Sequence, residues 1–147
     1  MKDATSAEVW EHATVGEELD PFEYVITRTM FDEYRRIVGD PEAAYPTVAG
    51  RHSLRAFTDR YGPAKLMNTG TESEYFNGVI PDRTIRVTAR IVDKYERRGK
   101  PYLVVESVAV DEDGRMIERS RLIGMSAQRS RPLFAAVSGK WEKGTAT

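Results

Sequence analysis

The sequence predicts an α+β domain in which one long helix lies against a five-stranded antiparallel sheet. Two observations favour this class. Apolar residues recur with helical spacing in the first half of the chain, and with a period of two from residue 68 onward. The chain has 147 residues, of which 40% are hydrophobic and 31% charged, and this composition suits a single globular domain of ordinary size.

The chain is expected to begin its folded part with a strand and a short helix. Residues 22–27 are rich in β-branched and aromatic side chains, which favour a strand. A helix should follow directly, with Thr29 and Asp32 as an approximate capping box at its start. Gly39 is expected to end this helix, because glycine readily adopts the left-handed conformation of a helix C-terminus.

A second, longer helix is expected from residue 47 or 48 to residue 61, where Gly62-Pro63 ends it. Its first turn, residues 47–50, is small and uncharged. The free backbone N–H groups of this turn could therefore face an anionic ligand instead of being covered by side chains.

The second half of the chain predicts sheet. Four strands are expected, at residues 68–76, 84–91, 102–110 and 115–126, with turns at residues 96–101 and 111–114. Residues 84–91 alternate most clearly between apolar and polar side chains, so one face of this strand should be buried and the other wet. One helix can cover only one face of the sheet, and a dimer that joins two sheets is therefore expected.

The composition excludes several classes of function. The chain has no cysteine and only two histidines, which rules out disulfides, thiolate zinc sites and iron–sulfur clusters and argues against a histidine-rich metal centre. A net charge of −1 excludes the strongly basic footprint of a general nucleic-acid binder. No apolar run is long enough to span a bilayer and no secretory signal opens the chain, so a cytoplasmic protein without membrane contact is expected.

Charge divides the chain into three expected parts. Residues 1–20 hold one lysine and six acidic residues, a balance of −5, and are expected to form an acidic N-terminal segment. Residues 21–127 are expected to form the domain. Residues 128–147 hold four basic residues and one acidic residue, a balance of +3, and are expected to form a basic C-terminal tail. The two ends are either solvated tails, or the basic tail meets an acidic partner or a phosphate-bearing ligand.

Three segments resemble the hot-dog fold of the MaoC-like hydratases and dehydratases, especially the N-terminal, non-catalytic type of domain. They are residues 31–51 (FDEYRRIVGDPEAAYPTVAGR), 68–87 (NTGTESEYFNGVIPDRTIRV) and 95–115 (YERRGKPYLVVESVAVDEDGR). The likeness covers roughly residues 20–127 and depends on a Gly-Asp after the first helix, an Ala-Gly at the start of the second and the turn at Pro81-Asp82. It implies a hot-dog fold, in which a five-stranded antiparallel sheet wraps around one long central helix, and it implies a dimer.

The resemblance also implies where the chemistry lies. In the family, an aspartate and a histidine together activate water for addition to an enoyl thioester. Aligning on Gly39-Asp40 places Tyr45 where the family has its histidine, and a phenol with a reference pKa of about 10 is a poor base at neutral pH. Asp40 is therefore the candidate base or water anchor, with a simple turn residue as the alternative, and Tyr45 either transfers protons or lines the pocket.

Other residues complete the candidate site. The backbone N–H groups of Ala49 and Gly50 are candidate donors to the developing enolate oxygen, as the family uses a glycine in this neighbourhood. His52 follows on the same helix and is either catalytic or an ordinary hydrogen-bonded or surface histidine. Asn68 either faces the ligand or faces solvent. The resemblance further allows two basic groups to approach the phosphates of coenzyme A: Arg97, Arg98 and Lys100, or Arg129 and Arg131.

These observations predict a MaoC-like hydratase or dehydratase that acts on an enoyl or 3-hydroxyacyl thioester, carried by coenzyme A or by a carrier protein. The chain is expected to work as a homodimer or as a heterodimer with a second hot-dog chain, without a metal or another cofactor. Two alternatives stay open. In the first, the chain is a non-catalytic, acyl-binding subunit whose partner supplies the missing histidine; in the second, it is a scaffold redirected to another reaction such as a cyclisation.

Overall fold

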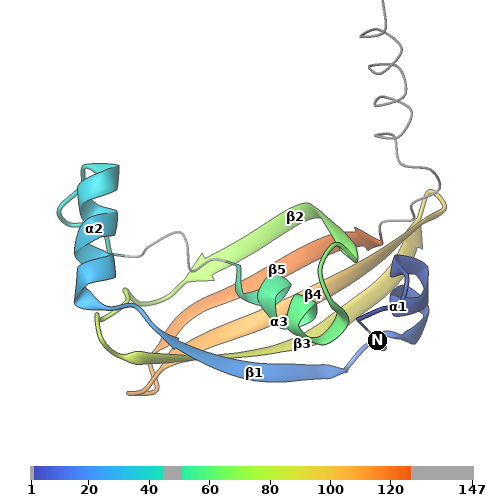
Figure 1. Cartoon of the computed structure of the whole chain (residues 1–147), viewed down its shortest axis with the longest axis horizontal. Coiled ribbons are helices and arrows are strands. Elements are labelled where there is room, and N and C mark those ends of the chain that lie inside the picture. Colours follow the sequence, from blue (N-terminus) through green and yellow to red (C-terminus); the bar gives the residue numbers. More distant parts are fainter. Residues whose placement is uncertain (1, 45–50, 127–147) are drawn as a thin grey trace, which may run out of the picture.

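The computed structural model describes residues 2–44 and 51–126. Its elements are α1 (Ser6–His12), β1 (Glu18–Val25), α2 (Arg28–Val38), α3 (His52–Tyr61), β2 (Leu66–Tyr75), β3 (Thr84–Arg97), β4 (Lys100–Asp111) and β5 (Met116–Ser126). The strands form one antiparallel sheet in the order β1-β3-β4-β5-β2, which curves around α3 (Figure 1). The predicted five-stranded antiparallel sheet with a central helix is therefore confirmed.

The helix α3 covers one face of the sheet, which we call the inner face. Ala56, Phe57 and Tyr61 of α3 are buried against apolar side chains that point inward from four strands. These strand residues are Leu19, Ala89, Ile91, Leu103, Val105 and Leu122. A second apolar cluster lies toward α2 and consists of Ile26, Phe31, Val79, Ile85, Val87, Ala109 and Ile117. Burial of these two clusters is the main force that holds the helix and sheet together.

A band of buried polar residues separates the two apolar clusters on the inner face. On β4, Ser107 lies between Val105 of the first cluster and Ala109 of the second. The same succession occurs on β5 and on the first residues of α3. The members of this polar band are His52, Ser53, Ser107, Glu118 and Ser120. The alternation of strands thus brings polar groups to one level of an otherwise apolar interior.

The acidic N-terminal segment is part of the folded domain. Thr5 and Glu8 form a capping box that starts α1, and Val9 and Ala13 are buried in the first apolar cluster. Trp10 donates a hydrogen bond from Nε1 to the carbonyl oxygen of Tyr102 at 3.2 Å. Because β1 already begins at Glu18, the expected boundary between residues 20 and 21 falls inside a strand. The acidic side chains of α1 face water while its few apolar ones face the core.

The start of α2 differs from the predicted one, whereas the predicted start of α3 is not tested. Thr27 caps α2, its Oγ1 accepting a hydrogen bond from the backbone N–H of Met30, so the predicted cap at Thr29 is wrong by two residues. Gly39 ends this helix with a φ of 73°, as predicted. The described part of α3 begins at His52, and residues 45–50, which include the predicted start of this helix, lie outside the described residues.

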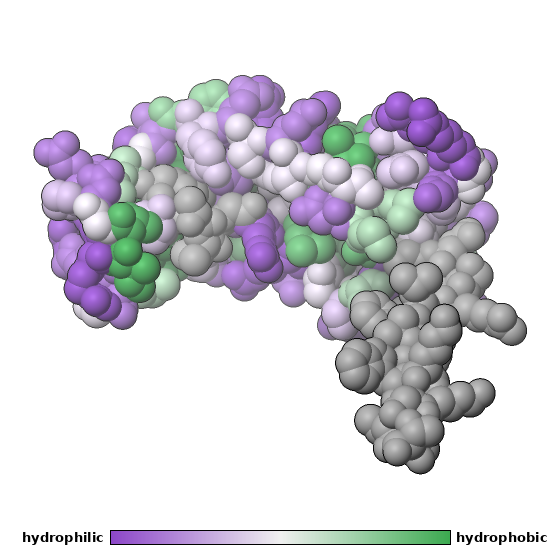
Figure 2. Space-filling model, turned by 90° about the horizontal axis from the view of Figure 1, so that it is seen from above, coloured by the Kyte–Doolittle hydropathy of each residue, from purple (hydrophilic) through white to green (hydrophobic). Residues whose placement is uncertain are grey.

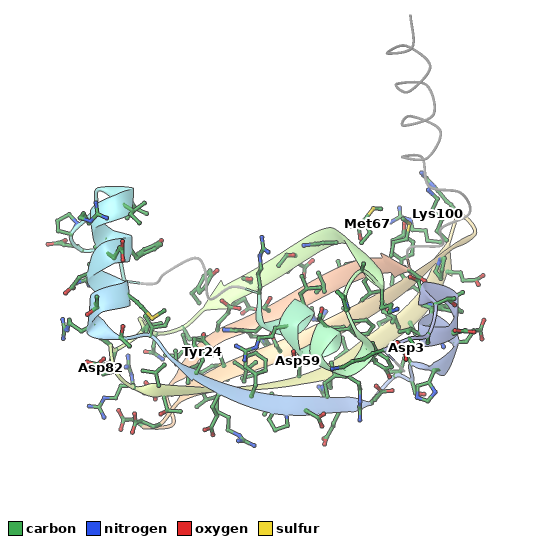
Figure 3. The ribbon with its side chains drawn as sticks, in the orientation of Figure 1. Asp3, Tyr24, Asp59, Met67, Asp82 and Lys100 are labelled. Atoms are coloured by element: carbon green, nitrogen blue, oxygen red, sulfur yellow. The ribbon has the colours of Figure 1, made fainter. Side chains whose placement is uncertain are left out.

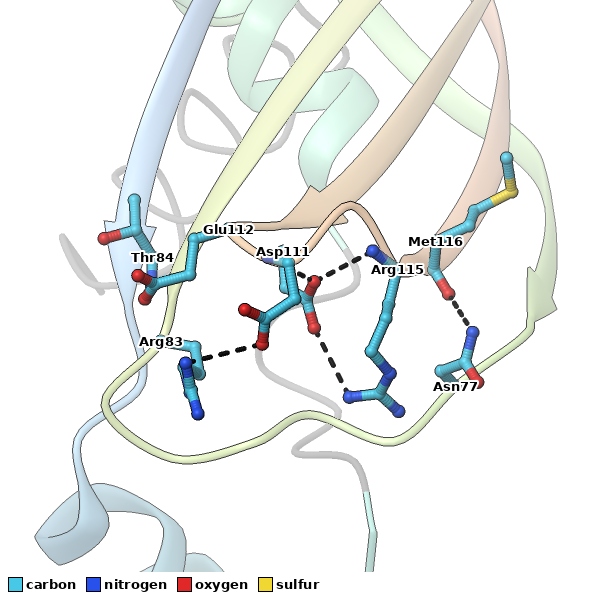
Figure 4. Close-up of polar contacts among 8 residues, drawn as sticks. Asn77, Arg83, Thr84, Asp111, Glu112, Arg115 and Met116 are labelled. Carbon is cyan, nitrogen blue, oxygen red and sulfur yellow. Dashed lines mark hydrogen bonds and ion pairs between the residues drawn. The ribbon is translucent and has the colours of Figure 1, made fainter.

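The predicted turn at residues 111–114 is confirmed (Figure 4). The Asp111 carboxylate accepts hydrogen bonds from the backbone N–H groups of Asp113 and Arg115, at 3.0 and 2.9 Å, and an ion pair with Arg115 adds a third contact. The turn hydrogen-bonds to its surroundings as well, because Glu112 accepts from the backbone N–H of Thr84. This local network sets the register of β4 against β5.

Candidate active site

The polar band converges on His52, the first residue of α3. Only 3% of this residue is exposed. Its Nε2 atom lies 2.6 Å from the hydroxyl oxygen of Tyr24 on β1, and its Nδ1 atom lies 3.4 Å from Oε1 of Glu118 on β5. Figure 3 labels Tyr24, which in that view lies between α2 and α3. Three elements that are far apart in the sequence therefore bring a phenol, an imidazole and a carboxylate together.

Glu118 is fully buried, with 0% exposure. It pairs with Ala109 of β4, which is buried on the inner face, and with Tyr75, the last residue of β2, so its side chain lies on the inner face near one end of β5. Neither of its carboxylate oxygens accepts a hydrogen bond from the residues described, and His52 Nδ1 is likewise without a hydrogen-bond partner there. A buried carboxylate without donors is destabilising, so its presence points to a functional role.

Serine hydroxyls continue the band from the helix toward the edge of the sheet. Ser53 Oγ lies 2.8 Å from Ser107 Oγ and 3.2 Å from the carbonyl oxygen of Ser120. Ser120 Oγ is in turn 3.4 Å from Ser73 Oγ on the edge strand β2. The floor beneath the first turn of α3 is therefore made of hydroxyl groups rather than of methyl and methylene groups.

The N-terminal end of α3 is electrostatically favourable for a negatively charged group. Arg51 is its N-cap residue and makes no side-chain hydrogen bond to the first turn. The N-terminal end of a helix carries a partial positive charge, which stabilises an anion held close to it. Phe22 flanks the site, and its ring centroid lies 6.2 Å from that of His52. The guanidinium carbon of Arg55 lies over the Phe22 ring, 4.1 Å from its centroid. An aromatic wall thus adjoins the polar floor.

The direction of the hydrogen bond between Tyr24 and His52 depends on the tautomer of the imidazole. A neutral imidazole that directs Nδ1–H toward the Glu118 carboxylate must use Nε2 as an acceptor, and this acceptor receives the hydroxyl proton of Tyr24. A proton that moves from Tyr24 to Nε2 would create an imidazolium beside the carboxylate, which would stabilise it. The three residues can therefore take up and return one proton.

Comparison with solved structures identifies the fold. A thioesterase superfamily member from Thermus thermophilus is similar with a TM-score of 0.62 and 20% identity, over 88% of this chain and 96% of that one. A MaoC-like dehydratase from Rhodospirillum rubrum has a TM-score of 0.56 and 15% identity, over 84% and 97%. The HadBC (3R-hydroxyacyl-ACP dehydratase) complex from Mycobacterium tuberculosis has a TM-score of 0.56 and 12% identity, over 75% and 95%.

The chain has the hot-dog fold. The resemblance to MaoC-like proteins is confirmed at the level of structure, since MaoC-like dehydratases are among the structural neighbours. Neither a protein-family model nor the sequence of a curated protein matches this chain.

Of the predicted site residues that lie within residues 2–44 and 51–126, the structure brings His52 to the polar band, and Asp40 and Asn68 lie elsewhere. Asp40 is an exposed residue after α2, where its carboxylate accepts a hydrogen bond from the backbone N–H of Glu42 at 2.9 Å. Asn68 is exposed on β2, and its side chain accepts from the backbone N–H of Gly70. Both side chains thus stabilise local backbone turns or bulges. Tyr45, Ala49 and Gly50 lie outside the described residues, and their predicted roles stay predictions.

Two residues of the site were missed by the sequence analysis. Glu118 carries a readable signal, because Arg119 and Arg121 in the same strand must face outward and this places residues 118 and 120 inward. Tyr24 alternates with exposed Glu23 and Val25 in β1 in the same way. The alternation predicts which face a side chain occupies, but only the assembled sheet shows that both side chains reach His52.

Hollows of about 460 and 540 Å³ on the outer face are lined in large part by charged side chains, among them Arg86, Arg90, Asp93 and Arg97. A hollow of about 310 Å³ is lined by Glu72, Glu74, Glu106, Arg119 and Arg121, among others, and these side chains are largely paired with one another. The hydrogen bond from Arg121 Nε to Glu106, at 2.8 Å, raises the pKa of that guanidinium. Residues 2–44 and 51–126 contain no cluster of three metal-ligating side chains and no helix long and apolar enough to cross a membrane.

Proposed function

We propose that this hot-dog protein is a hydratase or dehydratase that adds water to, or removes it from, the double bond of an enoyl thioester. The observation that carries the proposal is the burial of His52 between Tyr24 and Glu118 at the first residue of the central helix. The names of two structural neighbours, a MaoC-like dehydratase and a 3R-hydroxyacyl-ACP dehydratase, support the same class of reaction. The thioester would be carried by coenzyme A or by a carrier protein.

Hydration requires one proton to leave water and one to reach the α-carbon. Tyr24 is only half-buried, so its hydroxyl is the member of the group that can touch the reacting atoms. As water bonds to the β-carbon, Tyr24 accepts its proton and passes its own proton to His52 Nε2 across the 2.6 Å hydrogen bond. The proton then returns from His52 through Tyr24 to the α-carbon, which restores the starting state. Dehydration follows the same steps in reverse.

The remaining requirement is a donor to the enolate oxygen that forms on the thioester. The backbone N–H groups of Ala49 and Gly50 are the predicted donors. The described end of α3 supports this assignment, because the Arg51 side chain makes no capping hydrogen bond to the first turn and a helix N-terminus stabilises negative charge.

A second hot-dog chain is the partner that we propose. The surface of α2 presents Met30, Ile37 and Val38, of which Ile37 is 70% exposed, and Figure 2 shows hydrophobic side chains gathered at this end of the molecule. The strand β2 is an exposed edge of the sheet. The HadBC neighbour is itself a complex. We propose that these surfaces meet a second copy of this chain or a different hot-dog chain.

The test is turnover of crotonyl and longer enoyl thioesters by the purified chain, followed both as loss of the conjugated double bond and as release of free thiol. We expect hydration without thiol release. Tyr24→Phe and His52→Gln should each lower kcat/KM by at least about 100-fold, which is the usual contribution of a positioned acid–base group. Tyr95→Phe is the matched control, because Tyr95 stacks on Tyr102 away from the polar band and should leave the rate unchanged.

Three other results would replace this proposal. Thiol release in place of hydration would make the protein a thioesterase. Activity that appears only after co-expression with a second hot-dog chain, and that survives Tyr24→Phe, would favour the non-catalytic subunit. Loss of hydration in Asp40→Asn with full activity in Tyr24→Phe would return the catalytic role to the residue predicted from the sequence.

A further inference from the structure

We propose that the acyl group held at this site carries a hydroxyl, beyond the reacting carbons, that donates a hydrogen bond to Glu118. This inference rests on the proposed acyl-thioester function and names its substrate class. A plain alkyl enoyl thioester would then be a poor substrate compared with a hydroxylated one.

The first argument is the state of the two Glu118 oxygens. Oε1 lies 3.4 Å from His52 Nδ1, and neither Oε1 nor Oε2 accepts a hydrogen bond from the described residues. The side chain is fully buried, so bulk water does not supply a donor. A ligand hydroxyl that donates to Oε2 would satisfy a carboxylate that otherwise loses its solvation on folding.

The second argument is the surface around the carboxylate. Ser107 pairs with Ser120, two residues along β5 from Glu118, and Ser53 and Ser73 extend this row of hydroxyls toward α3 and toward the sheet edge. An alkyl chain laid along this band would bury its methylene groups against hydroxyls and leave the carboxylate without a donor. Favourable burial of alkyl carbon requires apolar neighbours, and the two apolar clusters on either side are already filled by their own side chains.

The number of donors favours a hydroxyl over an ammonium group. An ammonium has three N–H donors and requires three acceptors when it is removed from water. In the described part of the band, the serine oxygens already contact one another or a backbone carbonyl. The Glu118 carboxylate is the acceptor left without a partner, which matches a group with one donor.

The experiment measures binding rather than turnover, with freshly prepared saturated thioesters, which have no double bond to hydrate. Pantetheine thioesters of butyrate, valerate and hexanoate are compared by titration calorimetry with their 4-, 5- and 6-hydroxy counterparts, since coenzyme A and carrier proteins share pantetheine. At least one hydroxylated thioester should bind the wild-type protein about tenfold or more tightly than the alkyl thioester of equal length, because hydrogen bonds to charged groups are worth this much.

Variants assign the preference to one side chain. Glu118→Met removes the acceptor and should abolish the preference, whereas Glu118→Gln keeps a neutral acceptor and should retain part of it. Glu106→Met is the matched control, because Glu106 is a largely buried glutamate on the opposite face of the sheet, and it should retain the full preference. Thermal unfolding of each variant checks that it folds.

The possible failures are distinct. Equal binding of alkyl and hydroxylated thioesters by the wild-type protein would overturn this inference and leave the acyl-thioester function in place. A preference that survives in Glu118→Met would also overturn it. Binding of none of the six thioesters would overturn the proposed function, and this inference with it.

Discussion

The two ends of α3 use buried polar groups in opposite ways. At the C-terminal end, Tyr61 is enclosed by apolar residues, and its hydroxyl donates a hydrogen bond to Glu17, which also pairs with Arg60 at 3.2 Å. At the N-terminal end, Glu118 faces His52 with both oxygens unsatisfied by the described residues. The polar groups at the C-terminal end of α3 thus stabilise the fold, whereas the Glu118 carboxylate at the N-terminal end lacks hydrogen-bond donors among the described residues.

The two tyrosines of these ends follow the same division. Burial, followed by the hydrogen bond to the Glu17 carboxylate, raises the pKa of Tyr61 well above its ordinary value. This phenol is therefore held neutral as part of the core. Tyr24 is half-buried and hydrogen-bonded to an imidazole, which is a partner that can take its proton. The partner, rather than the phenol itself, distinguishes the structural tyrosine from the candidate catalytic one.

The largest expected effect is on the apolar end. Phe57→Ala should lower the free energy of unfolding by about 3–5 kcal/mol, because Phe57 is fully buried and its removal leaves a cavity. Chemical denaturation measures the loss. Phe76→Ala is the control, since Phe76 is exposed and its replacement should change stability by about 0.5 kcal/mol or less. Similar losses in both variants would contradict the assignment of the core.

The second-largest expected effect is a gain in stability, at the N-terminal end of α3 where the candidate site lies. Glu118→Met should raise the free energy of unfolding by about 1–3 kcal/mol, because it removes a buried carboxylate that lacks hydrogen-bond donors. The same change at Glu106 removes ion pairs with Arg90 and Arg121 and should lower stability by up to about 1 kcal/mol. A loss of stability in Glu118→Met would mean that the carboxylate is satisfied in the free protein.

Tyr61→Phe should lower stability at neutral pH by about 1 kcal/mol, through loss of the hydrogen bond to Glu17. The pKa of Tyr61 is raised in the folded state. Its contribution to stability is therefore complete below a pH of about 10, where the phenol is neutral in the unfolded chain as well. This contribution is lost as the pH rises further, because the unfolded phenol ionises first. The difference between wild type and variant should therefore shrink above that pH. Chemical denaturation of both proteins at a series of pH values from about 8 to 11 measures this difference in unfolding free energy. A difference that stays constant over this range would contradict the raised pKa.

The smallest effect tests the helix that closes the apolar end. Thr5→Ala removes the capping box of α1 and should lower stability by about 0.5–1 kcal/mol. Thr14→Ala serves as the control, because Thr14 is exposed and its hydroxyl donates a hydrogen bond to the carbonyl oxygen of His12, outside the helix cap. Equal effects of the two substitutions, measured by thermal unfolding, would show that α1 does not depend on its cap.

Much of the fold could be predicted because its signals are local. The alternation over residues 84–91 and the turn at residues 111–114 depend on neighbours in the chain, and both are present in the structure. The helix α1 was missed because it is short and has few apolar residues. Its stability depends on packing Val9 and Ala13 against strands that come much later in the sequence.

The sequence by itself determined the order of the elements from β1 onward, the alternation of faces along residues 84–91 and the resemblance to hot-dog proteins, since hydrophobic periodicity and turn residues are properties of short segments. Only the tertiary structure decided which polar residues meet. It left Asp40 in an exposed turn and brought Tyr24, His52 and Glu118 together from β1, α3 and β5. The physical reason is that strand pairing and the crossing of α3 set the distances between side chains, and no local pattern encodes a contact between residues so far apart in the chain.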